Sequence, residues 1–144
     1  MILIKPWEEA APEAYSIRSL VFIEEQGVPQ EIEIDEWDPL AQHALAYEDG
    51  CCIATGRLID LQDGSAQIGR MAVLAQFRKQ GIGSKVLTTL IEYGKSLGAF
   101  KFILHSQLTA IPFYEKQGFI ANGPIYDEAG IAHRNMILLI SATD

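Results

Sequence analysis

The stretch Gln76-Phe77-Arg78-Lys79-Gln80-Gly81-Ile82-Gly83-Ser84 joins a strand-like run to the clearest helical pattern in the chain. Over residues 81–97, apolar side chains recur every three or four positions and predict one buried helix face. The two glycines permit a sharp turn that presents backbone N–H groups at the positive end of this helix. Arg78, Lys79 and Lys85 add positive charge. The segment therefore predicts an anion site, most naturally for a diphosphate.

This segment differs from both common nucleotide-binding loops. A Walker loop needs a glycine where Gln76 stands, and the order Lys-Ser rather than Ser84-Lys85. A dinucleotide-binding loop needs Gly or Ala where Val86 stands. From these residues alone, an ordinary tight turn remains the alternative.

The rest of the chain predicts a mixed α+β domain. Helical spacing of apolar residues predicts a helix over residues 10–25, which Gly27-Val28-Pro29 ends. Strand-like runs at residues 43–47, 51–60 and 66–74 are joined by Asp49-Gly50 and Asp63-Gly64, dipeptides that favour tight hairpins. These runs predict an antiparallel meander. Further strands are expected at residues 2–4, 100–105 and 131–140, and a short helix at 109–117.

The composition excludes several classes of protein. With 144 residues, 49% of them hydrophobic, the chain can form one core, so we expect a single domain over residues 1–144. The net charge of −8 argues against binding to nucleic acid or to an anionic membrane surface. No run approaches the roughly 20 apolar residues of a membrane span, and the first residues lack a secretory signal pattern. We therefore expect a cytoplasmic protein.

The charge is unevenly distributed. Residues 1–66 hold three bases and fourteen acids, a net −11, whereas residues 67–144 hold eight bases and five acids, a net +3. An anionic ligand would favour the second part and a cationic one the first. Residues 24–38 hold seven acids and no base, interrupted by Ile32, Ile34 and Trp37. Because a purely solvated loop gains nothing from such apolar residues, this run is a candidate wall of a site.

The two cysteines offer little chemistry. Cys51 and Cys52 are adjacent in a strand-like run, where a disulfide between them is disfavoured and buried free thiols are expected. No Cys/His spacing resembles a zinc site, so no metal is expected.

Several motifs, in the right order, are similar to those of the GNAT N-acetyltransferases. The run Arg78-Lys79-Gln80-Gly81-Ile82-Gly83 resembles that family's acetyl-CoA loop, Arg/Gln-x-x-Gly-x-Gly/Ala. Residues 68–73 resemble the strand before the loop, and residues 110–119 a second signature. The chain also resembles the small bacterial ElaA-like branch of this family in two places. The first comprises Arg18, Val21, Phe22, Glu25, Gln26, Asp35, Asp38 and His43, and the second Glu128, Gly130, Ile131, His133 and Met136.

The resemblance implies a GNAT-like mixed sheet with about four helices, in which the meander and a parallel pair of strands splay apart at the cofactor site. It implies acetyl-CoA as the acyl donor. The residues that would bind it are Met71, Ala72 and Val73 on the pantetheine arm, Arg78, Lys79, Gln80, Gly81, Ile82, Gly83 and Ser84 on the pyrophosphate, and Phe113 and Tyr114 beside the thiol. The family often has Asn after the fifth strand, where this chain has Ser106-Gln107.

For the reaction, the resemblance and the charge distribution together predict direct transfer of an acetyl group to a primary amine of a small molecule or a peptide. Tyr114 would protonate the leaving thiolate. The acceptor side would be formed by Phe22, Glu25, Asp35, Asp38, His43 and His133. Glu25 and Glu128 are the favoured carboxylates for the general base, but Asp35, Asp38, His43, His105 and His133 remain alternatives.

Other functions stay open at this point. The chain could instead bind or sense acetyl-CoA without turnover, or bind phosphate compounds of another kind. Its exposed edge strands are compatible with a homodimer.

Overall fold

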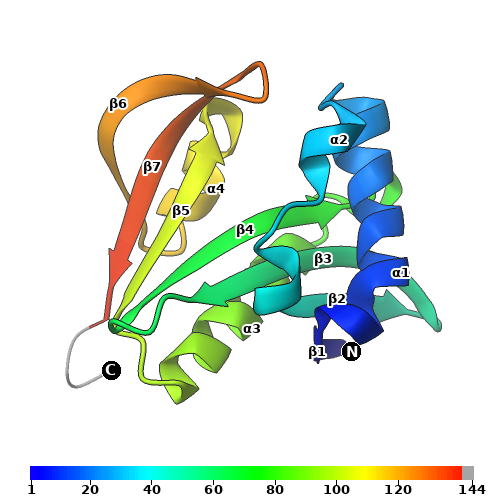
Figure 1. Cartoon of the computed structure of the whole chain (residues 1–144), viewed down its shortest axis with the longest axis horizontal. Coiled ribbons are helices and arrows are strands. Elements are labelled where there is room, and N and C mark those ends of the chain that lie inside the picture. The colour runs from blue at the N-terminus through cyan, green and yellow to red at the C-terminus, as the bar shows by residue number, and fades with distance from the viewer. Residues whose placement is uncertain (141–144) are drawn as a thin grey trace.

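The computed structural model describes residues 1–140 and contains one seven-stranded sheet in the order β1-β2-β3-β4-β5-β7-β6 (Figure 1). The strands are β1 (Ile2–Pro6), β2 (Gln42–Glu48), β3 (Cys51–Asp60), β4 (Ser65–Val73), β5 (Lys101–Gln107), β6 (Ile120–Glu128) and β7 (Ile131–Leu139). The helices are α1 (Trp7–Arg18), α2 (Gln30–Glu33), α3 (Ile82–Ser96) and α4 (Ile111–Glu115). The α+β fold class expected from the sequence is confirmed.

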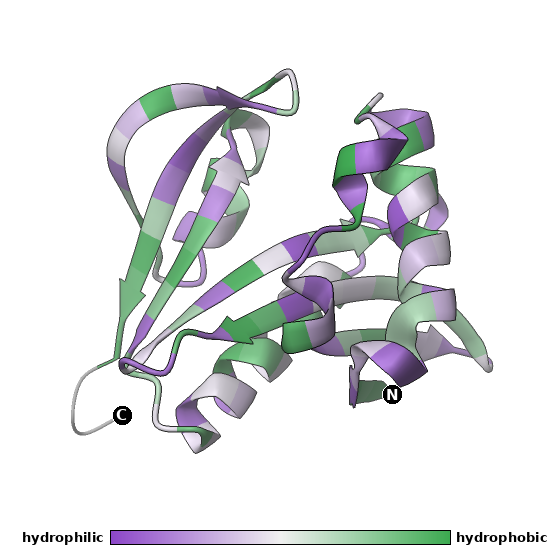
Figure 2. Cartoon of the chain, viewed as in Figure 1, coloured by the Kyte–Doolittle hydropathy of each residue, from purple (hydrophilic) through white to green (hydrophobic). Residues whose placement is uncertain are grey.

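Two helices cover opposite faces of the first four strands. α1 packs Ala10 and Ala14 on Leu45 of β2, while α3 packs Val86 and Leu90 in the main core. A Cβ on Gly56 of β3 would stand 3.0 Å from Leu90, so this glycine lets α3 approach the sheet closely. Hydrophobic and hydrophilic residues alternate along both helices in Figure 2, as expected when one helix face is buried.

The functionally important feature of the sheet is the separation of β4 from β5. The two strands are parallel and pair only from Ser65↔Lys101 to Ile68↔Leu104. Beyond that point they diverge, so that the sheet opens like a V (Figure 1). Residues 69–73 of β4 therefore keep β3 as a partner on one side and lack a strand on the other.

A bulge lies in β4 where the strands separate. Gly69 pairs with Arg57 and Ala72 with Thr55, so Arg70 and Met71 together oppose Gly56. Arg70 has a φ of 51°, in the left-handed region that is unfavourable for a non-glycine residue. Such bulges redirect side chains and are common next to functional sites.

The expected elements are present, the structure adds the short helix α2, and three further differences follow. The first helix begins at Trp7 and continues after Arg18 as a π-helical segment, Ser19–Glu25, here called η1. The short helix before Gly118 divides into Leu108–Ala110, a 3-10 turn, and α4. Strand β6 was missed because it is an edge strand that contains Gly123 and Pro124 and has mostly exposed side chains.

Within the described residues, the helices are all too short or too polar to cross a membrane.

Candidate active site

A cleft of about 960 Å³ lies where β4 and β5 separate. One wall comes from η1, the segment around α2, and β4. The other comes from β5, α4 and the hairpin between β6 and β7, and the turn before α3 closes one end. The cleft therefore brings together segments distributed along most of the chain.

The turn before α3 has the backbone of an anion site. Lys79 and Gly81 both have left-handed φ values, 64° and 80°, so successive N–H groups turn toward one side. Gly81 caps the helix without a side-chain hydrogen bond, and the first internal bond reaches its carbonyl from the N–H of Lys85. The N–H groups of Ile82, Gly83 and Ser84 consequently remain available to a phosphate.

The side chains of this turn contribute unequally. Lys79, Gly81, Ile82, Gly83 and Ser84 line the cleft, as does Lys116 after α4. Gln80 does not line the cleft, and its side-chain amide donates to the carbonyl of Gln76 at 3.4 Å. The cradle is thus mainly backbone, with lysines supplying charge at its border.

Arg78 is committed to the protein itself. Its Nε donates to the carbonyl of Val73 at 2.9 Å, and its two terminal nitrogens donate to the Glu25 carboxylate at 2.6 and 2.7 Å. The hydrogen bond to Glu25 raises the pKa of Arg78 and the bond from Arg78 lowers the pKa of Glu25. Arg78 therefore ties the cofactor turn to the end of η1.

The cleft edge of β4 consists of Gly69, Arg70, Met71, Ala72 and Val73. Because β5 has diverged, main-chain groups on this edge can pair with an extended ligand, as an added strand does. This is where the sequence analysis expected the pantetheine arm at Met71, Ala72 and Val73.

Tyr114 lies in the opposite wall, on α4. Tyr114 is 9% exposed, and burial raises the pKa of its hydroxyl to about 12. The ring of Phe113 packs edge-on against it at 5.0 Å, and both residues line the cleft. Among the described residues the Tyr114 hydroxyl has no hydrogen-bond partner, so it can donate to a ligand.

Three acids between η1 and β2, namely Glu33, Asp35 and Asp38, are paired with arginines. Arg18 donates to Glu33 at 2.5 Å and to Asp38 at 2.8 and 2.9 Å. Arg57 donates to Asp35 at 2.7 and 2.9 Å and to Asp38 at 2.9 Å. We call this cluster, completed by Arg70, the arginine–carboxylate network: Arg18, Glu33, Asp35, Asp38, Arg57 and Arg70.

Within this network, burial and ion pairing shift the pKa values of the charged groups in opposite directions. Burial alone would raise the pKa of Asp38, but the hydrogen bond and charge of Arg18, with Arg57, lower it to about 2. Burial also opposes the charge of Arg18, yet its bonds to Asp38 and Glu33 keep its pKa above the ordinary value. Arg18 and Asp38 therefore stay charged near neutral pH and neutralise one another. The carboxylates of the network add little to the negative surface of the run, which is left to exposed acids outside the network: Glu24, Glu31 and Glu36.

Two of the expected acceptor-side residues, Asp38 and His43, are buried and do not line the cleft. Asp38 is 0% exposed, and its carboxylate accepts only from Arg18, Arg57 and the N–H of Asp35. His43 is buried, bonds to the carbonyl of Asp38 and packs on Trp7, and burial lowers its pKa. Both residues brace the network rather than line the cleft.

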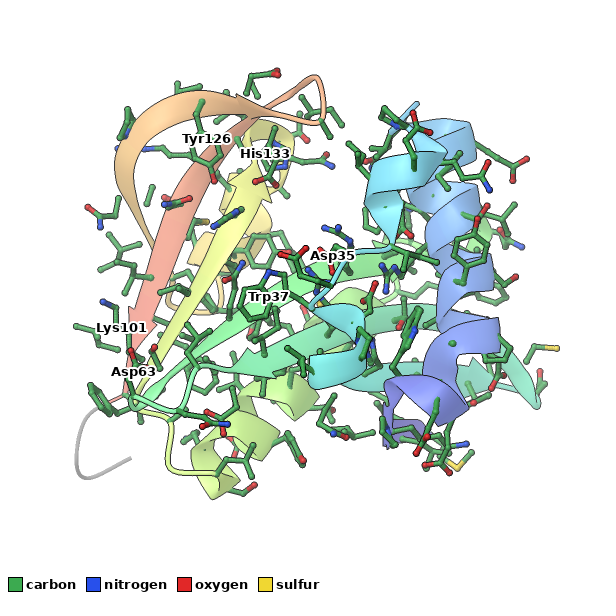
Figure 3. The ribbon with its side chains drawn as sticks, viewed as in Figure 1. Asp35, Trp37, Asp63, Lys101, Tyr126 and His133 are labelled. Atoms are coloured by element: carbon green, nitrogen blue, oxygen red, sulfur yellow. The ribbon has the colours of Figure 1, made fainter. Side chains whose placement is uncertain are left out.

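The remaining acceptor-side residues lie nearer the cleft. Phe22, Asp35 and His133 line it, whereas Glu25 does not and is paired with Arg78. Figure 3 places Asp35 and Trp37 on one side and Tyr126 and His133 across from them on β6 and β7. Trp37 and Ile32 also line the cleft, which fits the interpretation of residues 24–38 as a wall.

Glu128 lies between two histidines on the far wall. His105 Nδ1 is 3.0 Å from one carboxylate oxygen, and His133 Nε2 is 3.7 Å from the other. His133 Nδ1 lies 2.7 Å from the carbonyl of Ile131, so Nδ1 carries the proton and Nε2 faces Glu128. Glu128 is 43% exposed at its side chain and lines the cleft with both histidines. This group can exchange a proton with a ligand.

Sequence reasoning missed Arg57, Arg70 and Lys116. Arg18 and Arg57 are the only arginines in residues 1–66, and each stands beside an apolar residue, Ile17 and Leu58. That placement was a usable signal, since a buried arginine requires carboxylate partners. Where the family often has Asn, this chain has Ser106 and Gln107. The Gln107 side chain donates a hydrogen bond to Gln26 at 2.8 Å across the cleft.

The chain thus combines a mixed sheet that opens between two parallel strands with a backbone cradle at the start of a helix. The model of the acetyltransferase (GNAT) family matches residues 9–119. The chain belongs to the GNAT acetyltransferase family. The uncharacterized N-acetyltransferase YjcF of Bacillus subtilis is 34% identical over 131 residues, 90% of this chain and 93% of that protein.

Solved structures share this fold. A putative N-acetyltransferase from Lactobacillus plantarum superposes with a TM-score of 0.90 at 29% identity, covering 98% of each chain. Escherichia coli ElaA gives 0.84 at 22% identity, covering 96% of this chain and 98% of its own. A GNAT acetyltransferase from Elizabethkingia anophelis, solved with acetyl-CoA bound, gives 0.76 at 20% identity, covering 96% and 98%. The expected likeness to ElaA is thus confirmed at the level of the fold.

Proposed function

We propose that this protein transfers the acetyl group of acetyl-CoA to a primary amine of a small molecule, as one acetyltransferase domain over residues 1–144. The observation that carries the proposal is the meeting of three features in one cleft. These are the backbone cradle before α3, the strandless edge of β4 and the buried hydroxyl of Tyr114. The acetyl-CoA found in the Elizabethkingia relative supports the choice of donor.

The residues suit a polyanionic donor. The N–H groups of Ile82, Gly83 and Ser84 would hold the pyrophosphate, with Lys79 and Lys116 beside it. The main chain of Met71, Ala72 and Val73 would pair with the pantetheine amides. In this scheme Arg78 contributes by fixing the turn, because Glu25 already occupies its side chain.

The transfer itself follows from the groups around the reacting carbon. An amine must lose a proton before it can attack, since an ammonium has no lone pair. We assign that proton to the Glu128 carboxylate, which His105 contacts at 3.0 Å and which lies beside His133. The amine nitrogen then bonds to the thioester carbon, and a backbone N–H near Val73 stabilises the resulting oxyanion. When the carbon–sulfur bond breaks, sulfur keeps the electron pair and accepts the proton of Tyr114. The nitrogen loses its second proton as the amide forms, and that proton restores the tyrosine hydroxyl.

Burial makes Tyr114 suitable for this last step. A hydroxyl with a pKa of about 12 stays protonated at neutral pH and can always donate. Burial in the same wall would also raise the proton affinity of the departing thiolate, so that both partners of the proton transfer shift in the same direction.

The geometry favours direct attack over a thioester on the protein. Cys52 does not line the cleft, and its raised pKa makes it a poor nucleophile. Cys51 is exposed, contrary to the expectation of two buried thiols, and also lies outside the cleft lining.

Calorimetric titration with acetyl-CoA, followed by thiol release with an amine panel, tests the function. Gly83→Glu would add a carboxylate to the cradle and is expected to abolish binding. Gly83→Ala is its matched control, because a Cβ there stands 3.4 Å from Phe113 at ordinary contact. Binding that ATP shares equally would contradict the donor. Binding without thiol release would favour the alternative, a module that senses acetyl-CoA.

A further inference from the structure

The acceptor wall contains a guanidinium group, that of Arg70, which the proposed reaction does not use. We call its unpaired side the arginine edge. Arg70 donates through Nε to the carbonyl of Glu33 and through Nη2 to Asp35, both at 3.1 Å. Across residues 1–140, its other terminal nitrogen, Nη1, has no hydrogen-bond partner. The side chain is 25% exposed and lines the cleft. Arg70 therefore keeps two charged N–H donors unused on a side chain that its other bonds hold in position.

The network behind Arg70 holds this edge rigidly. Asp35, its nearest carboxylate, is already shared with Arg57 through two short bonds. Glu33 is 3.8 Å from Arg70 and much closer to Arg18. Burial, followed by the charges of Arg57 and Arg18, lowers the pKa of Arg70, which shows that its charge is incompletely compensated. A further anion at Nη1 would improve this balance.

A second unpartnered donor lies beside the same strand. Arg57 Nε is buried and lacks a hydrogen-bond partner in the part of the chain that the structure describes. A Cβ added to Gly69 would stand 3.8 Å from this Nε atom. Gly69 and Arg57 both line the cleft. The missing side chain at Gly69 thus lets a ligand approach the arginines closely.

The bulge in β4 directs Arg70 to this place. Its φ of 51° costs on the order of 1 kcal/mol for a residue with a Cβ. Strained residues of this kind persist where the surrounding structure fixes them, and they cluster at ligand sites. Apolar surface adjoins the arginine edge, because Ile32 is 48% and Trp37 41% exposed in the same wall.

From these contacts we infer that the acceptor amine also carries a carboxylate, which Arg70 binds, and an apolar body, which lies against Ile32 and Trp37. This inference rests on the proposed acetyl transfer and names the class of its acceptor: amino acids and related amino carboxylates. A carboxylate fits better than a phosphate, because one open guanidinium edge beside the Asp35 carboxylate matches a single negative charge.

The test compares acceptors that share a body and differ in charge. Phenylalanine, phenylalaninamide and phenylethylamine carry the same ring and amine, and β- and γ-amino acids vary the distance between amine and carboxylate. We expect kcat/KM for the best amino carboxylate to exceed that of its amide by about tenfold or more. The amide is a stringent comparison, because its less basic amine is more often in the attacking form.

Arg70→Gln should remove this preference and leave acetyl-CoA binding unchanged. The fold should persist, because Asp35 keeps both bonds to Arg57. Arg134→Gln is the matched control: Arg134 bonds to the carbonyl of Gly123 outside the cleft, and its loss should leave the preference intact. Equal kcat/KM for acids and amides, or the same loss for both in Arg70→Gln, would overturn the inference. Preference for a phosphorylated amine would overturn the choice of carboxylate.

A binding measurement separates failure of this inference from failure of the proposed function. Calorimetry of CoA-saturated protein with N-acetylphenylalanine and with its amide needs no turnover. Tighter binding of the acid, lost in Arg70→Gln, would support the carboxylate site even if no amine releases thiol. Equal binding of acid and amide would refute the site even if amines are acetylated.

Discussion

The two walls of the cleft hold their ionisable groups in opposite ways. On the α1 and β3 side, Arg18, Asp38 and Arg57 are buried and bonded to one another at 2.8–2.9 Å. On the β6 and β7 side, Glu128 is 43% exposed and approaches its histidines at 3.0 and 3.7 Å. Fully paired charges stabilise an arrangement, whereas partly paired and exposed ones can change protonation during a reaction. We therefore expect changes on the first wall to affect folding and changes on the second to affect rate.

The largest effect is expected from Arg18→Gln. This substitution leaves the carboxylates of Glu33 and Asp38 buried without their main partner. Breaking a buried ion pair from one side typically costs about 3–5 kcal/mol, so the free energy of unfolding should fall by about that much. Urea denaturation measures the change.

Arg134→Gln supplies the control, because that side chain lies outside the network and should cost less than about 1 kcal/mol. If Arg18→Gln unfolds at the same urea concentration as wild type, the network is not a stabilising unit.

The second effect is a loss of rate in Glu128→Gln with little change in stability. An amide cannot accept the amine proton, and a positioned base typically contributes 100-fold or more, so kcat should fall by about that factor. The pH at which the remaining activity rises should also shift upward. Steady-state thiol release over a pH series measures both quantities.

Glu25→Gln is a matched comparison on the first wall, because Glu25 and Glu128 are both 43% exposed at the side chain. Only Glu128 lines the cleft, so Glu25→Gln should keep kcat within a few-fold. The reverse pattern would make Glu25 the base and would contradict the assignment.

Much of this arrangement could be predicted from the sequence, for identifiable physical reasons. The turn before α3 depends on local backbone chemistry, so Gly81 and Gly83 at the start of an amphipathic helix indicate it, and the resemblance of residues 78–83 to the family's loop distinguishes an anion cradle from an ordinary turn. The meander likewise follows from Asp49-Gly50 and Asp63-Gly64, because hairpin turns are short-range features.

The acceptor wall could not be predicted in the same way, because its charges pair across long distances in the chain. The network joins Arg18 to Asp38 and Arg70 to Asp35, pairs that are 20 and 35 residues apart. A sum of charges over residues 1–66 counts these acids as open to a ligand and misses Arg70, which lies beyond that boundary. Net charge thus describes long-range attraction but not which carboxylates remain open.

The third effect is a loss of stability at acid pH, caused by protonation of the buried carboxylates in the first wall. The pKa of Asp38 is lowered from about 3.8 to about 2, so its stabilising contribution is present above pH 4. It is lost as the pH falls through the folded-state pKa, and amounts to about 2 kcal/mol. Asp35, whose pKa is lowered by Arg57 and Arg70 against the effect of burial, should contribute in the same direction.

Urea denaturation between pH 5 and pH 2 measures this loss. Asp38→Asn should be less stable than wild type at pH 6 and should show a flatter pH dependence. An equally steep pH dependence in Asp38→Asn would assign the acid sensitivity to other carboxylates.

The smallest effect concerns the ion pair of Glu25 and Arg78, which ties the cofactor turn to the end of η1. The side chains are 43% and 37% exposed, and exposed pairs contribute about 0–1 kcal/mol, so Glu25→Gln should barely change the free energy of unfolding. The same change frees the terminal nitrogens of Arg78 while Val73 still holds Nε. Released from Glu25, those nitrogens can turn toward the pyrophosphate, so acetyl-CoA should bind equally well or up to a few-fold more tightly, most clearly at low salt. Calorimetry at two salt concentrations measures this, and a weaker Kd would mean that Glu25 positions the cradle. The pair therefore distinguishes a charge that only fixes the turn from one that the donor itself requires.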